Sequence, residues 1–225
     1  GMLRLPASSL RLLRAPRGAR TAVTEGRFHS PITAALWELR AAEHAPCDPQ
    51  ACDPDQARPP SASEVAIGYA FRTDLMLAEQ YRNPWGYVRI GRILEDLDAL
   101  AGTVAFKHTA PRSPSNLLLV TASVDRIALL RHPRTDEDMT LTGRVDWVGK
   151  SSMVIGLTAE SGGSAWLRAA FTFVGRDPRT NKAAKVNPLE PDSEAARARF
   201  ERVAAQVERR RARAKATADP EEAAA

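Results

Sequence analysis

A long amphipathic stretch followed by four strand-like runs constrains the fold of this chain more than any other feature. From Val88 to Lys107, apolar residues recur at the spacing of one helical face. They form a single stripe, which comprises Ile90, Leu94, Leu97, Ala101 and Val104 and is widened by Ile93 and Leu100. A helix of this kind has one apolar face to bury, and a sheet with one apolar face can cover it.

The four runs that follow have the apolar and β-branched composition of strands. They are joined by short turns, of which Ser161-Gly162-Gly163 is a strong hairpin signal, and they cover Leu117–Ile127, Met139–Trp147, Ser152–Glu160 and Ala165–Val174. The first run is apolar enough to predict a central position in the sheet. The order of elements predicts an α+β fold, in which a long central helix is wrapped by a curved antiparallel sheet.

Two shorter elements precede the long helix. Residues 64–71 alternate between apolar and polar side chains, which predicts a half-buried strand. Thr73 or Asp74 can then cap a short helix that continues through Leu75 to Ala78.

Helical extensions flank this unit on both sides. Ser30 and Pro31 are suited to begin a helix that runs to about Ala42, and an irregular linker follows up to residue 63. Near the C-terminus, Asp192 or Ser193 can cap a basic helix that leads into an Ala/Glu-rich tail. The predicted organisation is an N-terminal helix and linker over 28–62, a folded domain over 63–190, and a basic helix and tail over 191–225.

Residues 1–27 have the composition of a mitochondrial transit peptide. Five arginines precede the first acidic residue, Glu25, and the segment also contains serines and leucines. A disordered basic arm is the alternative interpretation. The transit peptide predicts a mitochondrial protein located in the matrix.

Composition excludes several other classes of protein. The 225 residues carry a formal net charge of +5 and are 44% hydrophobic, which is enough for a core. No apolar run approaches the ~20 residues of a membrane-spanning helix. Cys47 and Cys52 have no further cysteine or histidine at zinc-like spacing, so they predict loop thiols and no metal site.

The segment from Tyr81 to Asp98 carries most of the chemistry. Asn83 and Gly86 lie in a polar turn that leads into the long helix, and three carboxylates follow in the first turns of that helix. A helix N-terminus presents unpaired N–H groups and a partial positive charge, so it can stabilise a developing oxyanion. The arrangement favours hydrolysis of a polarised carbonyl. The alternatives are a turn-forming role for Asn83 before Pro84 and a solvated helix face for the carboxylates.

Several blocks, in this order along the chain, resemble the mitochondrial acyl-CoA thioesterases that are built from two hotdog domains. The similarity is to their N-terminal hotdog half and covers about Phe28 to Arg210. The blocks are Asn83-Pro84-Trp85-Gly86, Arg89-Ile90-Gly91, the run from Leu94 to Gly102, the run from Val120 to Asp125, the run from Trp147 to Ser152, and the run from Ala184 to Leu189, together with His29-Ser30-Pro31 and the run from Ala35 to Glu38. The resemblance implies a hotdog fold and hydrolysis of fatty acyl-CoA to free acid and CoA, with acyl-CoA as substrate and no cofactor.

The resemblance also implies roles for individual residues. Asn83 would orient the carbonyl or the water, and Glu95, Asp96 or Asp98 of a partner would act as general base. Gly86, Gly91 and Arg92 would contribute to substrate binding, because a glycine at the helix start lets the thioester approach the backbone N–H groups.

One departure from the family changes the expected assembly. A second hotdog follows in those relatives, whereas this sequence continues into the basic helix and tail. The site is therefore expected to need a second hotdog, supplied by another copy or another chain.

Two other functions remain open from the sequence. The first is a catalytically inactive accessory subunit of a large mitochondrial assembly, such as the mitochondrial ribosome, a respiratory complex or the ATP synthase. The second is a sensor that binds CoA esters without turnover. The arginine-dense terminal helix could contact nucleic acid, but a solvated helix end explains its charge better.

Overall fold

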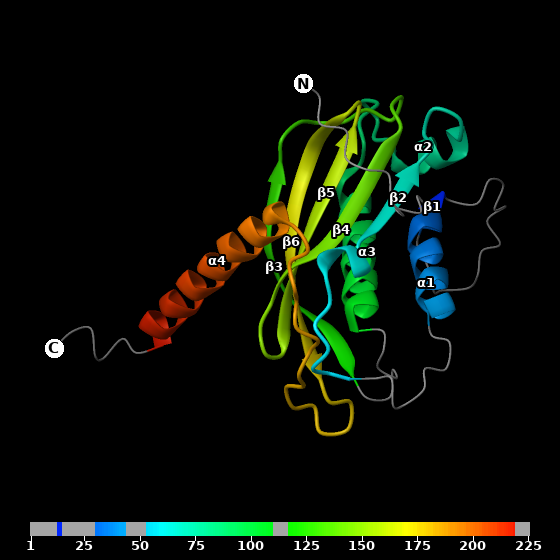
Figure 1. Ribbon diagram of the computed structural model, residues 1–225. Helices are drawn as coiled ribbons and strands as arrows, with labels where there is room; N and C mark the ends of the chain where they lie inside the picture. The colour runs from blue at the N-terminus through cyan, green and yellow to red at the C-terminus, as the bar shows by residue number, and fades with distance from the viewer. Residues whose placement is uncertain (1–12, 15–29, 44–52, 110–116, 219–225) are drawn as a thin grey trace.

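The structure is a computed structural model that describes residues 13–14, 30–43, 53–109 and 117–218. The central unit runs through β2 (Val65–Tyr69), α2 (Leu75–Tyr81), α3 (Ile90–Thr109), β3 (Leu118–Leu129), β4 (Met139–Val148), β5 (Ser152–Ser161) and β6 (Ser164–Arg176). It is flanked by β1 (Leu13–Arg14), α1 (Pro31–Glu43), the short 3-10 turn η2 (Pro60–Ala62) and α4 (Glu194–Ala218). The predicted hotdog fold is confirmed, because one long helix lies in a curved antiparallel sheet (Figure 1).

The strand order is β1-β2-β4-β5-β6-β3, and every pairing is antiparallel except that of β1 with β2. The prediction that the run after the long helix lies centrally is wrong, because among the described strands β3 pairs with β6 alone and forms the edge of the sheet. Its apolar side chains are largely exposed, as at Val124 and Ile127. Two register shifts, between Thr121 and Ser123 and between Val124 and Arg126, bend this edge.

Two differences concern the start of the chain. Leu13–Arg14, which fall in the predicted transit peptide, form β1 against β2, and no strand was predicted there. The other residues of that peptide, together with Cys47 and Cys52, lie outside the described residues. The transit peptide therefore stays a prediction.

The apolar stripe of α3 packs into the concave face of the sheet. Leu97, Leu100, Ala101 and Val104 are fully buried there. The approach is close at Gly143 of β4, where an added Cβ would lie 2.9 Å from Leu157 Cδ2 and 3.0 Å from Val104 Cγ2. The absence of a side chain at Gly143 therefore lets α3 pack closely against β4.

We expect Gly143→Ala to destabilise the protein by ~1–3 kcal/mol, because the new methyl group overpacks a core that has no room for it. Urea unfolding would measure the change. The control variant is Gly91→Ala, since a Cβ at Gly91 meets nothing within 4 Å. Gly163→Ser would be a poor control, because Gly163 has a φ of +75°. Equal unfolding midpoints for wild type and Gly143→Ala would contradict the packing argument.

Helix α1 covers the side of α3 that faces away from the sheet (Figure 1). Ile32 and Leu36 are fully buried between the two helices. Arg40 donates from Nε to Thr103 Oγ1 at 3.0 Å and from Nη2 to the Ala99 carbonyl at 3.0 Å. The N-terminal extension is therefore part of the folded unit.

The C-terminal end of α3 is held by two segments from outside the helix. His108 is fully buried, and its Nε2 lies 3.0 Å from the Asn187 carbonyl oxygen. The Asn187 side chain donates to the carbonyls of Asp53 and Gln56, while Arg58 donates to the carbonyls of Lys107 and His108. These bonds order residues that the composition alone assigned to an irregular linker.

We expect stability to fall below neutral pH because of His108. Burial is the main cause that lowers the pKa of His108 to about 4, from 6.5. Between these two values the unfolded chain binds a proton that the folded chain does not, so stability is complete above pH 6.5 and falls by up to ~3 kcal/mol as pH drops to 4.

Urea unfolding from pH 4 to pH 8 would measure this dependence. His108→Gln should flatten the curve in that window, and the matched change at exposed His132, His132→Gln, should leave it as in the wild type. A wild-type curve that is flat across the window would rule out a buried neutral His108.

Helix α4 lies on the opposite, outer face of the sheet and projects away from it (Figure 1). The Ser193 side chain caps it by accepting from the N–H of Ala196 at 3.2 Å. Arg199 lies 3.6 Å from Asp146 of β4, Arg210 pairs with Asp125 of β3, and the Arg211 guanidinium lies 5.7 Å from the Trp147 ring centre. Among the described helices, none is long and apolar enough to cross a membrane.

Candidate active site

The turn before α3 is built around the side chain of Asn83. Its Oδ1 accepts from the N–H groups of Trp85 and Tyr87, both at 3.0 Å, and its carbonyl accepts from Gly86 N–H at 3.0 Å. Gly86 has a φ of +82°, which glycine adopts without strain. Asn83 is therefore a turn-forming residue, and its Nδ2 has no partner among the residues that the structure describes.

The N-terminus of α3 follows this turn directly. Arg89 N–H donates to the Tyr81 carbonyl and Arg92 N–H to the Arg89 carbonyl, so both of these groups are occupied. The N–H groups of Ile90 and Gly91 have no acceptor within the described part of the chain. Because Gly91 is exposed with open space beside its Cα, an acceptor from a ligand can reach these two groups.

An exposed stripe of α3 begins at Gly91 and continues through Glu95 and Asp98. Glu95 Oε2 pairs with Arg92 Nη1 at 3.3 Å, and both side chains are at the surface. Asp98 lies seven residues beyond Gly91, or ~10 Å along the helix. A general base must be within about 3 Å of the proton it removes, or one water further, so Asp98 cannot serve a carbonyl held at Gly91 of its own chain.

Thr121 is the partner of Asp98 and was missed as a site residue. Its Oγ1 donates to Asp98 Oδ1 at 3.2 Å. Thr121 lies on β3, so the bond joins the exposed stripe of α3 to the open edge of the sheet. The only sequence signal was the position of Thr121 within one of the blocks that carry the family resemblance.

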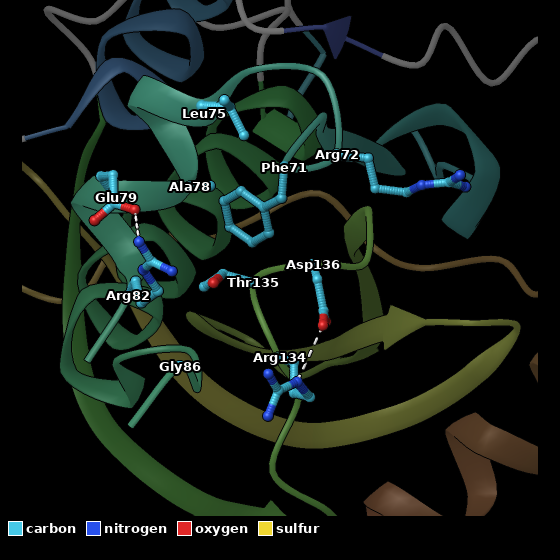
Figure 2. A pocket seen from close by; sticks show the side chains of 10 residues that line it. All are labelled: Phe71, Arg72, Leu75, Ala78, Glu79, Arg82, Gly86, Arg134, Thr135 and Asp136. Atoms are coloured by element: carbon cyan, nitrogen blue, oxygen red, sulfur yellow. Dashed lines mark hydrogen bonds and ion pairs between the residues drawn. The ribbon is translucent and has the colours of Figure 1, made fainter. Parts of the chain in front are cut away.

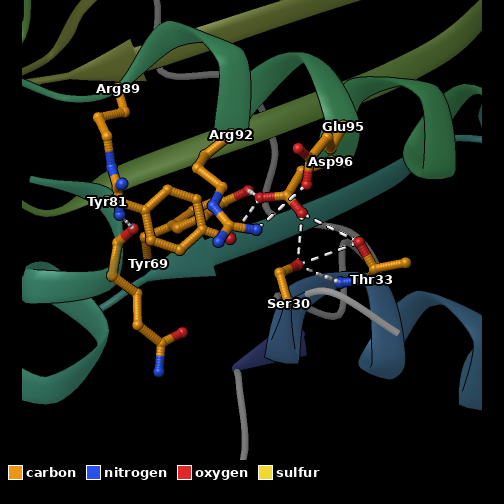
Figure 3. Close-up of polar contacts among 9 residues, drawn as sticks. Ser30, Thr33, Tyr69, Tyr81, Arg89, Arg92, Glu95 and Asp96 are labelled. Atoms are coloured by element: carbon orange, nitrogen blue, oxygen red, sulfur yellow. Dashed lines mark hydrogen bonds and ion pairs between the residues drawn. The ribbon is translucent and has the colours of Figure 1, made fainter. Parts of the chain in front are cut away.

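Asp96 lies on a different side of α3 from Glu95 and Asp98, and it is fully buried. Its Oδ1 accepts from Ser30 Oγ at 2.6 Å and Thr33 Oγ1 at 3.1 Å, and its Oδ2 accepts from Tyr69 at 2.8 Å and Tyr81 at 2.5 Å (Figure 3). Burial raises the pKa of Asp96, and the hydroxyl hydrogen bonds oppose that rise. Four donors fill the acceptor sites of the carboxylate, which favours an anchoring role for this residue.

The predicted site residues therefore lie in three places. Asn83, Gly86, Gly91 and Arg92 gather at the start of α3, with Glu95 one turn further, whereas Asp96 points inward and Asp98 faces the β3 edge. No group of three or more metal-ligating side chains occurs in the described ranges.

Curated relatives of the chain are acyl-coenzyme A thioesterases. The chain is 44% identical over 201 residues to the chloroplastic acyl-coenzyme A thioesterase 2 of Humulus lupulus, covering 83% of this chain and 46% of that protein. It is 43% identical over 183 residues to the mitochondrial acyl-coenzyme A thioesterase 4 of the same plant, covering 75% and 35%. The mitochondrial acyl-coenzyme A thioesterase 9 of Mus musculus is 36% identical over 139 residues, covering 58% of this chain and 32% of the relative. The chain thus spans about half, or less, of these relatives, and no protein-family profile matches it.

Solved structures share the fold. The acyl-CoA hydrolase of Staphylococcus aureus, solved with butyryl coenzyme A and coenzyme A, has a TM-score of 0.61 at 21% identity, covering 74% of this chain and 95% of that one. The same hydrolase has been solved as separate alanine variants of an asparagine, an aspartate and a threonine. An apo-hexameric acyl-CoA thioesterase has a TM-score of 0.57 at 23% identity, covering 71% and 97%.

Proposed function

Because the chain belongs to the family of acyl-coenzyme A thioesterases represented by these relatives, we propose that it hydrolyses fatty acyl-CoA to the free acid and CoA. The observation that carries this proposal is the pair of unpaired N–H groups, on Ile90 and Gly91, beside the free amide of Asn83. Asn83 lies in the turn directly before α3, and the two N–H groups lie in the first turn of that helix, so the three donors are positioned at one end of α3 to bind a thioester carbonyl oxygen.

The active site is completed by a second hotdog that pairs along β3. Exposed apolar side chains lie along β3 and directly after its last residue: Leu118, Val124, Ile127, Leu129 and Leu130. An open apolar strand edge is a surface for strand pairing. Pairing there also brings the Asp98–Thr121 pair of one hotdog toward the partner, which answers the distance problem within one chain.

In the proposed reaction, the N–H groups of Ile90 and Gly91 hold the carbonyl oxygen and stabilise the negative charge that develops on it. Asp98 of the partner hotdog removes a proton from a water molecule, whose oxygen attacks the carbonyl carbon. The carbon–sulfur bond then breaks, and the CoA thiolate leaves and takes up the proton. Asn83 orients the carbonyl or the water through Nδ2, and Thr121 holds Asp98 in position. Neither Asp96 nor Glu95 takes part in the proposed reaction: Asp96 anchors the core, and Glu95 forms a surface ion pair with Arg92.

The spacing of two residues supports these assignments. Asn83 and Asp98 are separated by fifteen positions, as are the asparagine and the aspartate replaced in the S. aureus variants.

The names of the relatives support an organellar location, since they are chloroplastic or mitochondrial proteins. Of these two organelles, the mitochondrion is favoured, and within it the matrix, because residues 1–27 have the arginine-rich composition of a mitochondrial transit peptide.

The proposal is tested by measuring thiol release from acyl-CoA esters of several chain lengths, with the oligomeric state determined on the same sample. We expect turnover by a paired form and little by a monomer. The proposal is contradicted if a stably paired protein hydrolyses no ester of the series. The accessory subunit and the CoA-ester sensor would then be the remaining functions.

A further inference from the structure

A pocket of about 510 Å³ lies directly beside the turn that carries Asn83. It is formed by the end of β2, by α2, and by the loop that leads into β4, and this volume is within the range of small-ligand sites. Gly86 contributes to its lining and also donates to the Asn83 carbonyl. The pocket and the proposed reaction centre therefore share one turn of the chain.

The centre of the pocket is apolar. Phe71 and Ala78 are buried beneath its floor, where Figure 2 shows the Phe71 ring in the middle of the lining residues, and Leu75 is the exposed apolar side chain of the lining. Leu75 is 73% exposed and therefore offers apolar surface to a ligand in the pocket. A planar ring that entered the pocket would cover this side chain.

The surroundings of that centre are charged. Figure 2 shows the guanidinium groups of Arg82 and Arg134 around the Phe71 ring, while the Arg72 side chain points away from it. Arg82 pairs with Glu79, and Arg134 Nε lies 3.1 Å from Asp136 Oδ2. All four of these side chains are about half exposed, so water screens the attraction within each pair strongly.

Both guanidinium groups are therefore available to a stronger anion. Phosphate accepts two parallel hydrogen bonds from a guanidinium group, and such charge-assisted bonds are about twice as strong as neutral ones. Glu79 and Asp136 would be displaced toward solvent, where their exposed carboxylates remain hydrated.

An exposed leucine beside two half-exposed guanidinium groups matches a ligand that joins a planar ring to phosphates. We propose that this pocket binds the 3′-phosphorylated ADP end of the acyl-CoA. The inference rests on the proposed function, since it places the two ends of one substrate on either side of the Asn83–Gly86 turn. The flexible pantetheine arm connects these ends, and the thioester lies at the start of α3.

Titration of the oligomeric protein with adenosine 3′,5′-bisphosphate by calorimetry tests the pocket without requiring turnover. We expect the double variant Arg82→Gln/Arg134→Gln to bind this probe ~100-fold more weakly than the wild type, since each charged contact accounts for about tenfold. The matched control is Arg168→Gln, a change at an exposed arginine on β6 that should leave the affinity unchanged. Equal affinity for wild type and double variant, or no binding by the wild type, overturns the inference.

Kinetics separate this inference from the proposed function. The double variant should raise KM for acyl-CoA by a similar factor, yet leave kcat/KM unchanged for the same acyl group on pantetheine, which has no nucleotide. Equal losses on both substrates would place the arginines in the reaction itself and overturn the pocket. If the wild type hydrolyses neither substrate, the proposed function fails, and the titration still decides the pocket.

Discussion

Co-expression of an Asn83→Ala chain with an Asp98→Asn chain should restore about a quarter of wild-type turnover, although each variant alone should be ~10²–10³-fold slower. The reason is that each proposed site takes Asn83 from one hotdog and Asp98 from the other. Half of the pairs formed from equal amounts are mixed, and each mixed pair has one intact site out of two. The measurement is thiol release from acyl-CoA by the co-purified protein.

In the matched control, the Asn83→Ala chain is co-expressed with the double variant Asn83→Ala/Asp98→Asn. No pair then contains an intact Asn83, so turnover should not recover. A Glu95→Gln chain serves as a second control, because Glu95 is an exposed carboxylate one turn away and should retain activity by itself. Different tags on the two chains would show that mixed pairs form. If purified mixed pairs have no recovered turnover, both residues act within one chain.

We expect Asp96→Ala to lower the free energy of unfolding by ~3–5 kcal/mol and the Tm by roughly 10 °C. The substitution leaves the hydroxyl groups of Ser30, Thr33, Tyr69 and Tyr81 without their acceptor in a region that water does not reach. It also disconnects the start of α1 from α3. Urea and thermal unfolding would measure the loss.

Two further variants calibrate this result. Asp96→Asn keeps one oxygen for the hydroxyls and should cost less than Asp96→Ala, while Glu95→Ala, on the exposed side of the same helix turn, should stay within ~0.5 kcal/mol of the wild type. An Asp96→Ala protein that is as stable as the wild type but inactive would return Asp96 to the catalytic residues.

The fold was predictable because its strongest signals are periodic. The stripe from Ile90 to Val104 has the spacing of one helix face, and the apolar and β-branched runs after it have the composition of strands with short connections. The start of α3 was placed two residues early, since Val88 N–H donates to the Pro133 carbonyl in a contact between distant segments. The edge position of β3 was missed because its apolar composition is the same as that of a strand buried within a sheet, whereas in the structure these side chains are exposed.

The candidate site was predictable in outline only. The turn at Asn83 and the helix start follow from local chemistry, but the direction of each carboxylate depends on where the apolar stripe is covered. Asp96 is buried because α1 and the residue before it, which contact Asp96 from 63 and 66 residues earlier in the chain, cover a second face of α3. Thr121 is brought to Asp98 by the β3–β6 pairing, which no local pattern encodes. The arginine-flanked pocket likewise joins three separate segments.

The two bulges of β3 bear on how the protein avoids aggregation before it finds a partner. A straight apolar edge strand would accept any extended peptide and could propagate into a fibril. The register shifts at Thr121/Ser123 and Val124/Arg126 curl this edge, so only a strand with matching curvature can form a full ladder along it. In the proposed pair, the two β3 edges cover each other, so neither edge stays open to a further strand at this seam.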